Sequence, residues 1–382
     1  MTRAIGERAA RVALGRLGEP GDPRLCGLVA ELGAEAVHAY LLEEQQVTGV
    51  ATDVAARLQG LDPLGDLERA ARQGLRFVCP GEPEWPARVA DLDRADTLNG
   101  RGGAPLGLWL RGAGRLDELC ERSVSVVGSR SATTYGTSVA AGISADLAGE
   151  GFSVVSGAAF GIDQAAHRGA LARPGPTIAV LACGVDRAYP AAHRDLLTYV
   201  AETGLVVSEL APGCAPTKLR FLARNRMIAA MSLGTVVVEA AVRSGALNTA
   251  NWASLLNRTV MGVPGPVTSA PSEGVHDLLR TRGASLVTRG SDVLELVSPS
   301  GSFVQPPLRA PARLKDRLSP LEQQVLDAVP VVTAAPVSSV ARTAGIAEPA
   351  VAGALQRLRS GGFVEASGAG RWRLSTDHTR RR

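Results

Sequence analysis

Short runs of apolar residues, many of them β-branched, alternate with helix-length segments between residues 123 and 297. The runs expected to form strands are Val124–Val127, Phe152–Val155, Thr177–Leu181, Leu205–Ser208, Thr235–Val238, Thr259–Val263 and Ser285–Val287. Continuous apolar strands separated by helices are typical of a parallel sheet that is covered on both faces. The sequence therefore predicts an α/β domain that binds its ligand at the carboxyl ends of the strands.

The segment before this domain has a helical period instead. Its apolar positions are Leu25, Leu28, Val29 and Leu32, then Ala36, Val37, Tyr40 and Leu41, with Gly33 between the two sets. Residues 1–75 are predicted to form a helical module, similar to SAM or helix-hairpin-helix domains. Such a module could bind nucleic acid, or it could be two packed helices. Prolines exclude a long helix from the next segment, where Leu108–Leu110 is predicted as a short strand, and we assign residues 76–297 to the α/β domain.

The pattern after the α/β domain predicts a separate carboxyl-terminal domain. Residues 298–317 are rich in proline and lack periodicity, which indicates a linker. Helices are expected over Pro320–Val329, Val337–Ala344 and Glu348–Ser360, followed by short strands at Phe363–Val364 and Arg371–Leu374. Three helices and a hairpin over residues 318–375 are typical of a winged helix, and a small helical domain with a basic face is the alternative. Residues 376–382 form a basic tail.

Composition restricts the chemistry that this chain can perform. The net charge is +4 over 382 residues, and three of the positive charges belong to the last three arginines, so anion binding requires a local patch. The five cysteines form no C-x-x-C pair and lack zinc-ligand spacing. We find no signal peptide and no apolar run of membrane-spanning length. We therefore expect a cytoplasmic protein without a membrane segment, a metal or a cofactor.

Small residues follow two of the predicted strands. Gly128, Ser129 and Arg130 come after the first strand, where backbone amides at the start of a helix and a guanidinium could hold phosphate. Ser156 and Gly157 follow the second strand. Asp163 and His167 lie four residues apart in the next helix, on one face. They could form an acid–base pair, or Asp163 could bond to loop amides while His167 packs beneath.

A third group of polar residues surrounds the strand at 235–238. Arg224, Asn225 and Arg226 precede this strand, Glu239 ends it, and Ser244 and Gly245 open the following helix. Positive charge and backbone donors should thus converge at one edge of the sheet, which suits phosphate. We expect Glu239 to be structural, to pair with Arg224 or Arg226, and to accept amides from the turn at residues 244–245.

Together these motifs resemble the bacterial DNA-processing protein A family, DprA or Smf. The resemblance rests on an ordered series of motifs between about residues 123 and 290, which includes Gly128–Arg130, Ser156–Gly157, Gly161–Asp163, Tyr189–Pro190, Arg224–Arg226, Ser244–Gly245 and Val263–Gly265. It implies an extended Rossmann-like domain that binds single-stranded DNA, protects incoming DNA and loads the RecA recombinase during natural transformation. It also implies a homodimer formed through this domain.

The resemblance implies most of a set of DNA-contacting residues, to which we add Arg226, Ser244 and Gly245 from their motifs. We expect Asp163, His167 and Glu239 to be structural support. The set comprises Gly128, Ser129, Arg130, Ser156, Gly157, Phe160, Arg224, Asn225, Arg226, Ser244 and Gly245. Phe160 and Phe221 are the aromatic residues of these loops that could stack on bases, or they could belong to the core.

Two other functions remain open at this point. Nucleotide phosphoribohydrolases of the lysine-decarboxylase-like type share a Gly-rich Rossmann-like fold, and Glu239 with the turn at Ser244–Gly245 is similar to their catalytic loop. Their Pro-Gly-Gly-x-Gly-Thr run before the glutamate is missing here. A transcriptional regulator would rest on the winged helix alone and would bind a specific duplex sequence.

Overall fold

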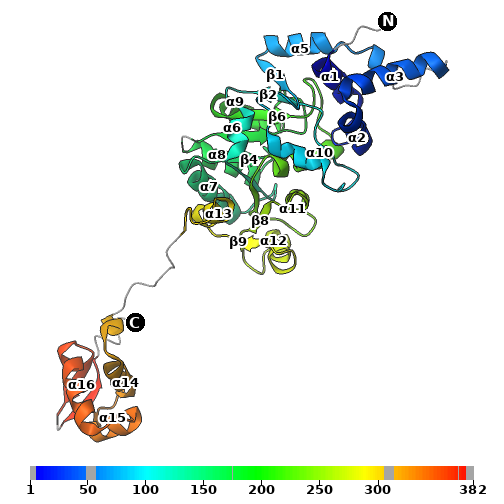
Figure 1. Ribbon diagram of the computed structural model, residues 1–382. Coiled ribbons are helices and arrows are strands. Elements are labelled where there is room, and N and C mark those ends of the chain that lie inside the picture. Colours follow the sequence, from blue (N-terminus) through cyan, green and yellow to red (C-terminus); the bar gives the residue numbers. More distant parts are fainter. Residues whose placement is uncertain (1–5, 49–56, 174, 305–313, 369, 376–382) are drawn as a thin grey trace. The chain divides into compact units, whose positions relative to one another are not determined.

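The computed structural model describes residues 6–48, 57–173, 175–304, 314–368 and 370–375 (Figure 1). The chain divides into two compact units, Met1–Gln305 and Pro306–Arg382. The second unit begins within the predicted linker, of which residues 305–313 lie outside the described residues, as does the basic tail.

The first unit is built on one sheet, in which nine strands are described. In spatial order, with bounds, they are β1 (Leu75–Val78), β2 (Leu108–Arg111), β6 (Leu205–Ser208), β5 (Thr177–Val180), β4 (Ser153–Ser156), β3 (Ser123–Val127), β7 (Gly234–Val237), β8 (Thr259–Gly262) and β9 (Ser285–Leu286). Strands β3 to β9 are parallel to one another, while β2 pairs antiparallel with β6 and β1 pairs antiparallel with β2 at the edge. The predicted α/β class and its seven parallel strands are confirmed; β1 was not predicted.

The strand order reverses between β3 and β7. From β3 the chain adds β4, β5 and β6 on one side, and then β7, β8 and β9 on the other. Ligands of doubly wound sheets bind in the crevice at the carboxyl ends of the two strands at such a reversal. The amide of Ser129 donates to the carbonyl of Glu239 at 2.7 Å, which joins the two strand ends. The topology therefore places two of the predicted motifs at the ligand-binding edge.

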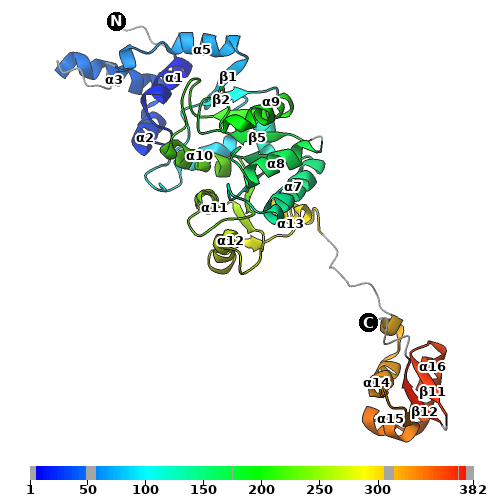
Figure 2. The same ribbon diagram turned by 180° about the vertical axis from the view of Figure 1, so that it is seen from behind.

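Helices cover both faces of the sheet (Figures 1 and 2). Their bounds are α6 (Leu116–Glu121), α7 (Thr134–Gly149), α8 (Ile162–Leu171), α9 (Arg194–Thr203), α10 (Lys218–Ala230), α11 (Gly245–Leu255), α12 (Ala270–Thr281) and α13 (Gly290–Val297), with 3-10 turns η1 (Ala87–Asp93) and η2 (Ala191–His193). Successive strand residues point to opposite faces. Val126 packs in the cluster of α7, α8 and α13, whereas Val127 packs in the cluster of α10 and α11.

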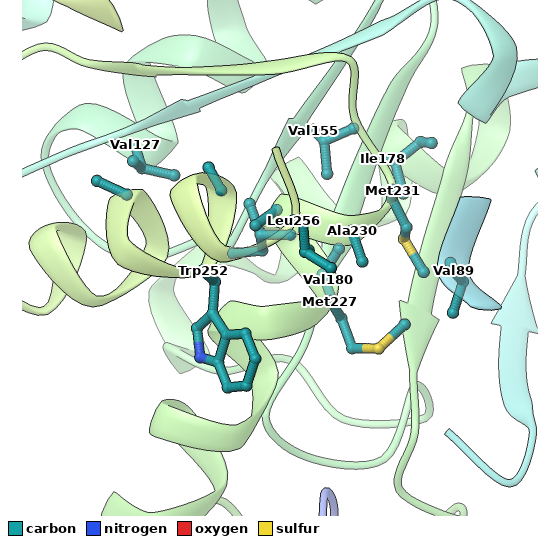
Figure 3. Packing of buried hydrophobic residues seen from close by; sticks show 14 of the residues in the cluster. Val89, Val127, Val155, Ile178, Val180, Met227, Ala230, Met231, Trp252 and Leu256 are labelled. Carbon is teal, nitrogen blue, oxygen red and sulfur yellow. The ribbon is translucent and has the colours of Figure 1, made fainter. Parts of the chain in front are cut away.

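Figure 3 shows the packing of the second of these clusters. Met227 and Ala230 of α10 and the following Met231 share this cluster with Trp252 of α11 and the following Leu256. Val155, Ile178 and Val180 of the sheet belong to the same cluster. Trp252 is fully buried. Because burial of such side chains contributes about 1.5–3 kcal/mol each, this layer fixes α10 and α11 relative to the strand ends.

The amino-terminal helices pack against the α/β domain within the same compact unit, and the predicted boundary at residue 75 stays a prediction. They are α1 (Glu7–Leu17), α2 (Pro23–Leu32), α3 (Ala34–Thr48) and α5 (Pro63–Arg72). Val12 of α1 and Ala70 of α5 share one apolar cluster with Phe77 and Trp109 of the sheet edge. Glu19 accepts from Arg220 of α10 at 2.9 and 2.7 Å. Contacts of this kind unite the helices with the α/β domain in one compact unit.

None of the described helices is by itself long and apolar enough to cross a membrane. Pro23–Leu32 and Ala34–Glu43 satisfy the length and composition only as a pair, which is bent by 111°.

The second unit contains the three helices and two strands expected in its sequence. They are α14 (Pro320–Ala328), α15 (Val337–Ala344), α16 (Glu348–Ser360), β11 (Val364–Ser367) and β12 (Arg371–Leu374), with η3 (Leu314–Arg317) and the short strand β10 (Ala335–Pro336) in addition. The strand order is β10–β12–β11, and all pairs are antiparallel. A capping box between Ser319 and Glu322 starts α14. The winged-helix assignment stays a prediction.

Candidate nucleic-acid interface

An open cleft of about 680 Å³ lies at the carboxyl ends of β3 and β7. Its walls are the loops that follow β3, β4, β5, β6 and β7, together with one face of α10 and the start of α11. Seven of the predicted contact residues line it, namely Gly128, Ser129, Arg130, Arg224, Asn225, Ser244 and Gly245. The topological reversal and the predicted site therefore coincide.

Basic side chains outnumber carboxylates in this cleft. Arg130, Lys218 and Arg243 are exposed along its walls, and Arg224 lies at its base. Asp163 is the carboxylate that lines it, and that residue is 5% exposed. Among the described residues, none of the three exposed cations has a carboxylate within ion-pairing distance. Their charge is therefore available to an anion, and the low-dielectric walls concentrate the field.

Two aromatic rings stand at one side of the cleft. The ring centroids of Phe221 and Tyr189 are 5.5 Å apart, and the planes are tilted by 49°. The guanidinium carbon of Arg130 lies 4.8 Å from the centre of the Phe221 ring, and that of Arg224 lies 5.9 Å from it. Tyr189 is 42% exposed. An aromatic face flanked by cations suits an unpaired base and its phosphate.

Arg224 forms the buried framework of the cleft. It is 7% exposed, and its Nη1 donates to the carbonyl oxygens of Gly157 and Val180 at 2.7 and 2.6 Å. Burial lowers the pKa of Arg224 to about 10, while the nearby Asp163 favours the charged form. A side chain at Gly157 would overlap the guanidinium, so glycine is required there. The guanidinium thus links the ends of β4 and β5 and also places positive charge beneath the cleft.

Asn225 positions the start of α11. Its Nδ2 donates to the carbonyl of Gly245 at 3.2 Å and to Oδ1 of Asn248 at 3.2 Å. Ser244 is the N-cap, and its hydroxyl accepts from the amide of Ala246 at 3.3 Å. Amides at the first turn of a helix attract anions. The contacts of Asn225 therefore hold the amino-terminal end of α11, which attracts anions, at the wall of the cleft.

Glu239 caps α7, which corrects the expected pairing with Arg224 or Arg226. Its carboxylate accepts from the Thr133 amide at 2.9 Å and from the Thr133 hydroxyl, and it is 2% exposed. A Cβ at Gly136 would overlap this carboxylate. The carboxylate therefore occupies the amino-terminal end of α7, where an anion is stabilised. This internal anion uses the amide of the N-cap residue Thr133, and phosphate binding by the turn at Gly128–Arg130 stays a prediction.

Asp163, which lines the cleft, and the fully buried His167 both lie on α8. Asp163 Oδ2 accepts from the amides of Gly157 and Ala159 at 3.2 and 3.4 Å. Burial raises the pKa of Asp163, while Arg224 and these amides act against the rise. Burial also lowers the pKa of His167 to about 3, so its imidazole is neutral, and Nδ1 lies 2.8 Å from the Thr177 hydroxyl. The geometry is that of a structural support, with loop amides on the carboxylate and the ring packed beneath.

Four predicted contact residues do not line the cleft. Arg226 is fully buried, and its Nη2 donates to both oxygens of Glu209 at 2.6 and 2.8 Å. It lies on the face of α10 turned toward the amino-terminal segment, so its assignment to DNA is corrected. Ser156 is buried and donates to Val126, and Gly157 is buried beneath Arg224. Phe160 is 46% exposed but packs edge-on against His193, with centroids 4.6 Å apart.

Sequence reasoning missed Lys218, Tyr189 and Arg243 as cleft residues. Lys218, Phe221 and Asn225 recur at helical spacing, so a helical projection of residues 218–230 would have placed Lys218 on the wall. Arg243 directly precedes the N-cap Ser244, a position from which a long side chain can reach a ligand at the helix start.

The fold and this cleft define a Rossmann-like α/β protein with a cationic ligand site at the strand-order reversal. The model of the family described as DNA recombination-mediator protein A matches residues 76–298, and this chain belongs to that family. The chain is 43% identical over 363 residues to a putative DNA processing protein DprA of Mycobacterium tuberculosis, an alignment that covers 94% of this chain and 92% of the relative.

Two further comparisons agree with this membership. Protein Smf of Escherichia coli is 36% identical over 271 residues, which cover 68% of this chain and 70% of the relative. The X-ray structure of DNA processing protein A from Streptococcus pneumoniae superposes with a TM-score of 0.61 at 31% identity, covering 75% of this chain and 96% of that one. The chain therefore has the role of a DNA-processing recombination mediator.

Proposed function

We propose that this chain binds single-stranded DNA in the cleft at the ends of β3 and β7. The observation that carries the proposal is the aromatic pair Phe221–Tyr189, with the guanidinium of Arg130 beside the Phe221 ring. Lys218 and Arg243 line the same cleft. Base stacking on such rings requires an exposed base face, which a duplex does not offer. Phosphate contacts from Arg130, Lys218 and Arg243 add affinity without sequence preference.

The broader role follows from the same binding event. A mediator that holds a single strand protects it and presents it to a recombinase, so RecA loading onto bound DNA in the cytoplasm is part of the proposal. Homodimer formation through residues 76–297 belongs to it as well. Both steps can be measured as RecA filament formation on protein-bound DNA and as the mass of the protein in solution.

The proposed activity is binding without chemistry on the nucleotide. In the competing hydrolase hypothesis, Glu239 would be the catalytic carboxylate. That carboxylate is buried, engaged with Thr133 and outside the lining of the cleft. Incubation with nucleoside monophosphates should therefore release no free base, and release that Glu239→Gln abolishes would support the hydrolase instead.

Fluorescence anisotropy with labelled oligo(dT) and with a labelled duplex tests the proposed function. We expect the full chain to bind the single strand more tightly. Phe221→Leu should weaken that binding by about tenfold, since stacking contributes about 1–3 kcal/mol per base, and should leave duplex binding unchanged. Equal or tighter binding of the duplex by the wild-type chain would contradict the proposal.

A further inference from the structure

A second groove, of about 460 Å³, adjoins the cleft. Tyr189 and Pro216 line both spaces, so one aromatic ring stands at their junction. The Arg groove, as we name it, is further lined by Arg111, Arg187 and Arg194. These side chains come from the end of β2, the loop after β5 and the first residue of α9.

The three arginines of the Arg groove are not used by the fold as ion pairs. Arg187 and Arg194 are exposed, Arg111 is half-buried, and among the described residues none has a carboxylate within ion-pairing distance. Arg111 donates to the Thr198 hydroxyl at 3.4 Å. These side chains therefore have donors left for a ligand.

The position of Arg194 is also unfavourable for the helix that carries it. Arg194 is the first residue of α9, which runs to Thr203. The amino-terminal end of a helix carries partial positive charge, so a cation there is disfavoured. Asp195 supplies a favourable negative charge in the same turn, so the turn carries both signs and the Arg194 charge stays free of an ion pair among the described residues.

One carboxylate lines the Arg groove beside the three arginines. Asp186 Oδ1 and Oδ2 accept from the amide of Gly213 at 2.9 and 3.0 Å, which fixes the loop after β6. Three guanidinium groups against one carboxylate leave the groove with an excess of positive charge. An anion with repeated charges, rather than a single carboxylate, fits such a surface.

We propose that the Arg groove is a second phosphate-binding subsite, in which a single strand held in the cleft continues past Tyr189. This inference rests on the proposed function, because the strand reaches the groove only from the cleft. Tyr189 marks the boundary: bases stack at the aromatic pair, and the phosphates beyond it contact Arg187 and Arg194. The occupied site is therefore longer than the cleft.

The length dependence of binding tests this subsite. The full chain is titrated with oligo(dT) of about 4 and about 12 nucleotides, within the range of known single-strand sites. The variant is Arg187→Gln/Arg194→Gln. Its matched control is Arg24→Gln/Arg94→Gln, which removes the same charge from exposed arginines that line neither space.

The Arg187→Gln/Arg194→Gln variant should bind the short oligonucleotide like the control and should lose affinity for the long one. The slope of log affinity against log salt should fall by about 1.4 for the long oligonucleotide, about 0.7 for each phosphate contact. Asp186→Asn, which keeps an acceptor for Gly213, should tighten only the long oligonucleotide.

Two results would overturn the inference while leaving the proposed function intact. In one, the variant and control bind the long oligonucleotide equally; in the other, the variant weakens both lengths by the same factor. Failure of the wild-type chain to bind either oligonucleotide would overturn the proposed function and the subsite together.

Discussion

The cleft of the first unit and the basic surface of the second unit use arginine in different ways. In the second unit, Arg357 pairs with Glu322 at 2.6 Å and Arg373 pairs with Glu365. In the cleft, Arg130 has no carboxylate partner among the described residues, and Arg224 is buried beneath it on two carbonyls. The two ion pairs neutralise Arg357 and Arg373, whereas the charge of Arg130 stays available to an anion at the cleft.

The largest expected effect is a difference in the free energy of unfolding between variants of Arg224, which is buried at the cleft, and of Arg357, which forms an ion pair in the second unit. Arg224→Ala should lower the free energy of unfolding by about 3 kcal/mol, because two buried carbonyls lose their donor. Arg357→Ala removes an exposed ion pair and should change it by less than about 1 kcal/mol. Denaturant unfolding of both variants measures the difference. Equal stability of Arg224→Ala and the wild-type chain would contradict the buried framework.

The next largest effect concerns the Glu239 carboxylate, which binds Thr133 at the amino-terminal end of α7. Gly136→Ala should lower the free energy of unfolding by about 1–3 kcal/mol, because the new methyl group overlaps the Glu239 carboxylate. Gly142→Ala lies in the same helix with open space around it, and it should raise stability by about 0.5–1 kcal/mol. Thermal unfolding distinguishes them, and a stabilising Gly136→Ala would show that Glu239 does not hold the end of α7.

A smaller effect is the pH dependence of the free energy of unfolding that arises from the buried His167. The folded state keeps His167 neutral down to a pKa of about 3, whereas the ordinary value is 6.5. Between these values the unfolded chain binds the extra proton, so the stabilising contribution of neutral His167 is lost as pH falls from 6.5 toward 3. The pKa of Asp163 is raised in the folded state, so protonation of this carboxyl group favours the folded state as the pH falls, opposite to the effect of His167.

His167→Asn tests this contribution. The variant should be less stable than the wild-type chain at pH 7, and its disadvantage should shrink as the pH falls through this window. Unfolding curves of both proteins at matched pH values give the difference. A disadvantage that stays constant from pH 7 to pH 4 would show that His167 is not held neutral.

Much of the fold could be predicted from the sequence because its signals are local. Seven parallel strands were found from apolar runs, and the helices over Val337–Ala344 and Glu348–Ser360 have the predicted bounds. The packing of the amino-terminal helices could not be predicted, because Val12 and Ala70 contact a sheet edge that only the tertiary structure brings to them.

The site could be predicted only in part, since motif position does not specify which face of a helix is exposed. Arg224 and Arg226 belong to one motif, yet Arg224 lines the cleft and Arg226 faces Glu209 behind α10. The partner of Glu239 is Thr133, which is 106 residues away in the chain. Contacts over such distances follow from the sheet order, which the strand pattern alone leaves open.

The salt dependence of single-strand binding tests the central claim most directly. Anisotropy titrations across salt would compare the wild-type chain with the cleft variant Arg130→Gln/Lys218→Gln and with Arg357→Gln/Arg373→Gln of the second unit. We expect the cleft variant to reduce the slope of log affinity against log salt by about 1.4, and the second-unit variant to leave the slope unchanged. Equal slopes for the wild-type chain and the cleft variant, or a reduction confined to the second-unit variant, would contradict the assignment of the cleft.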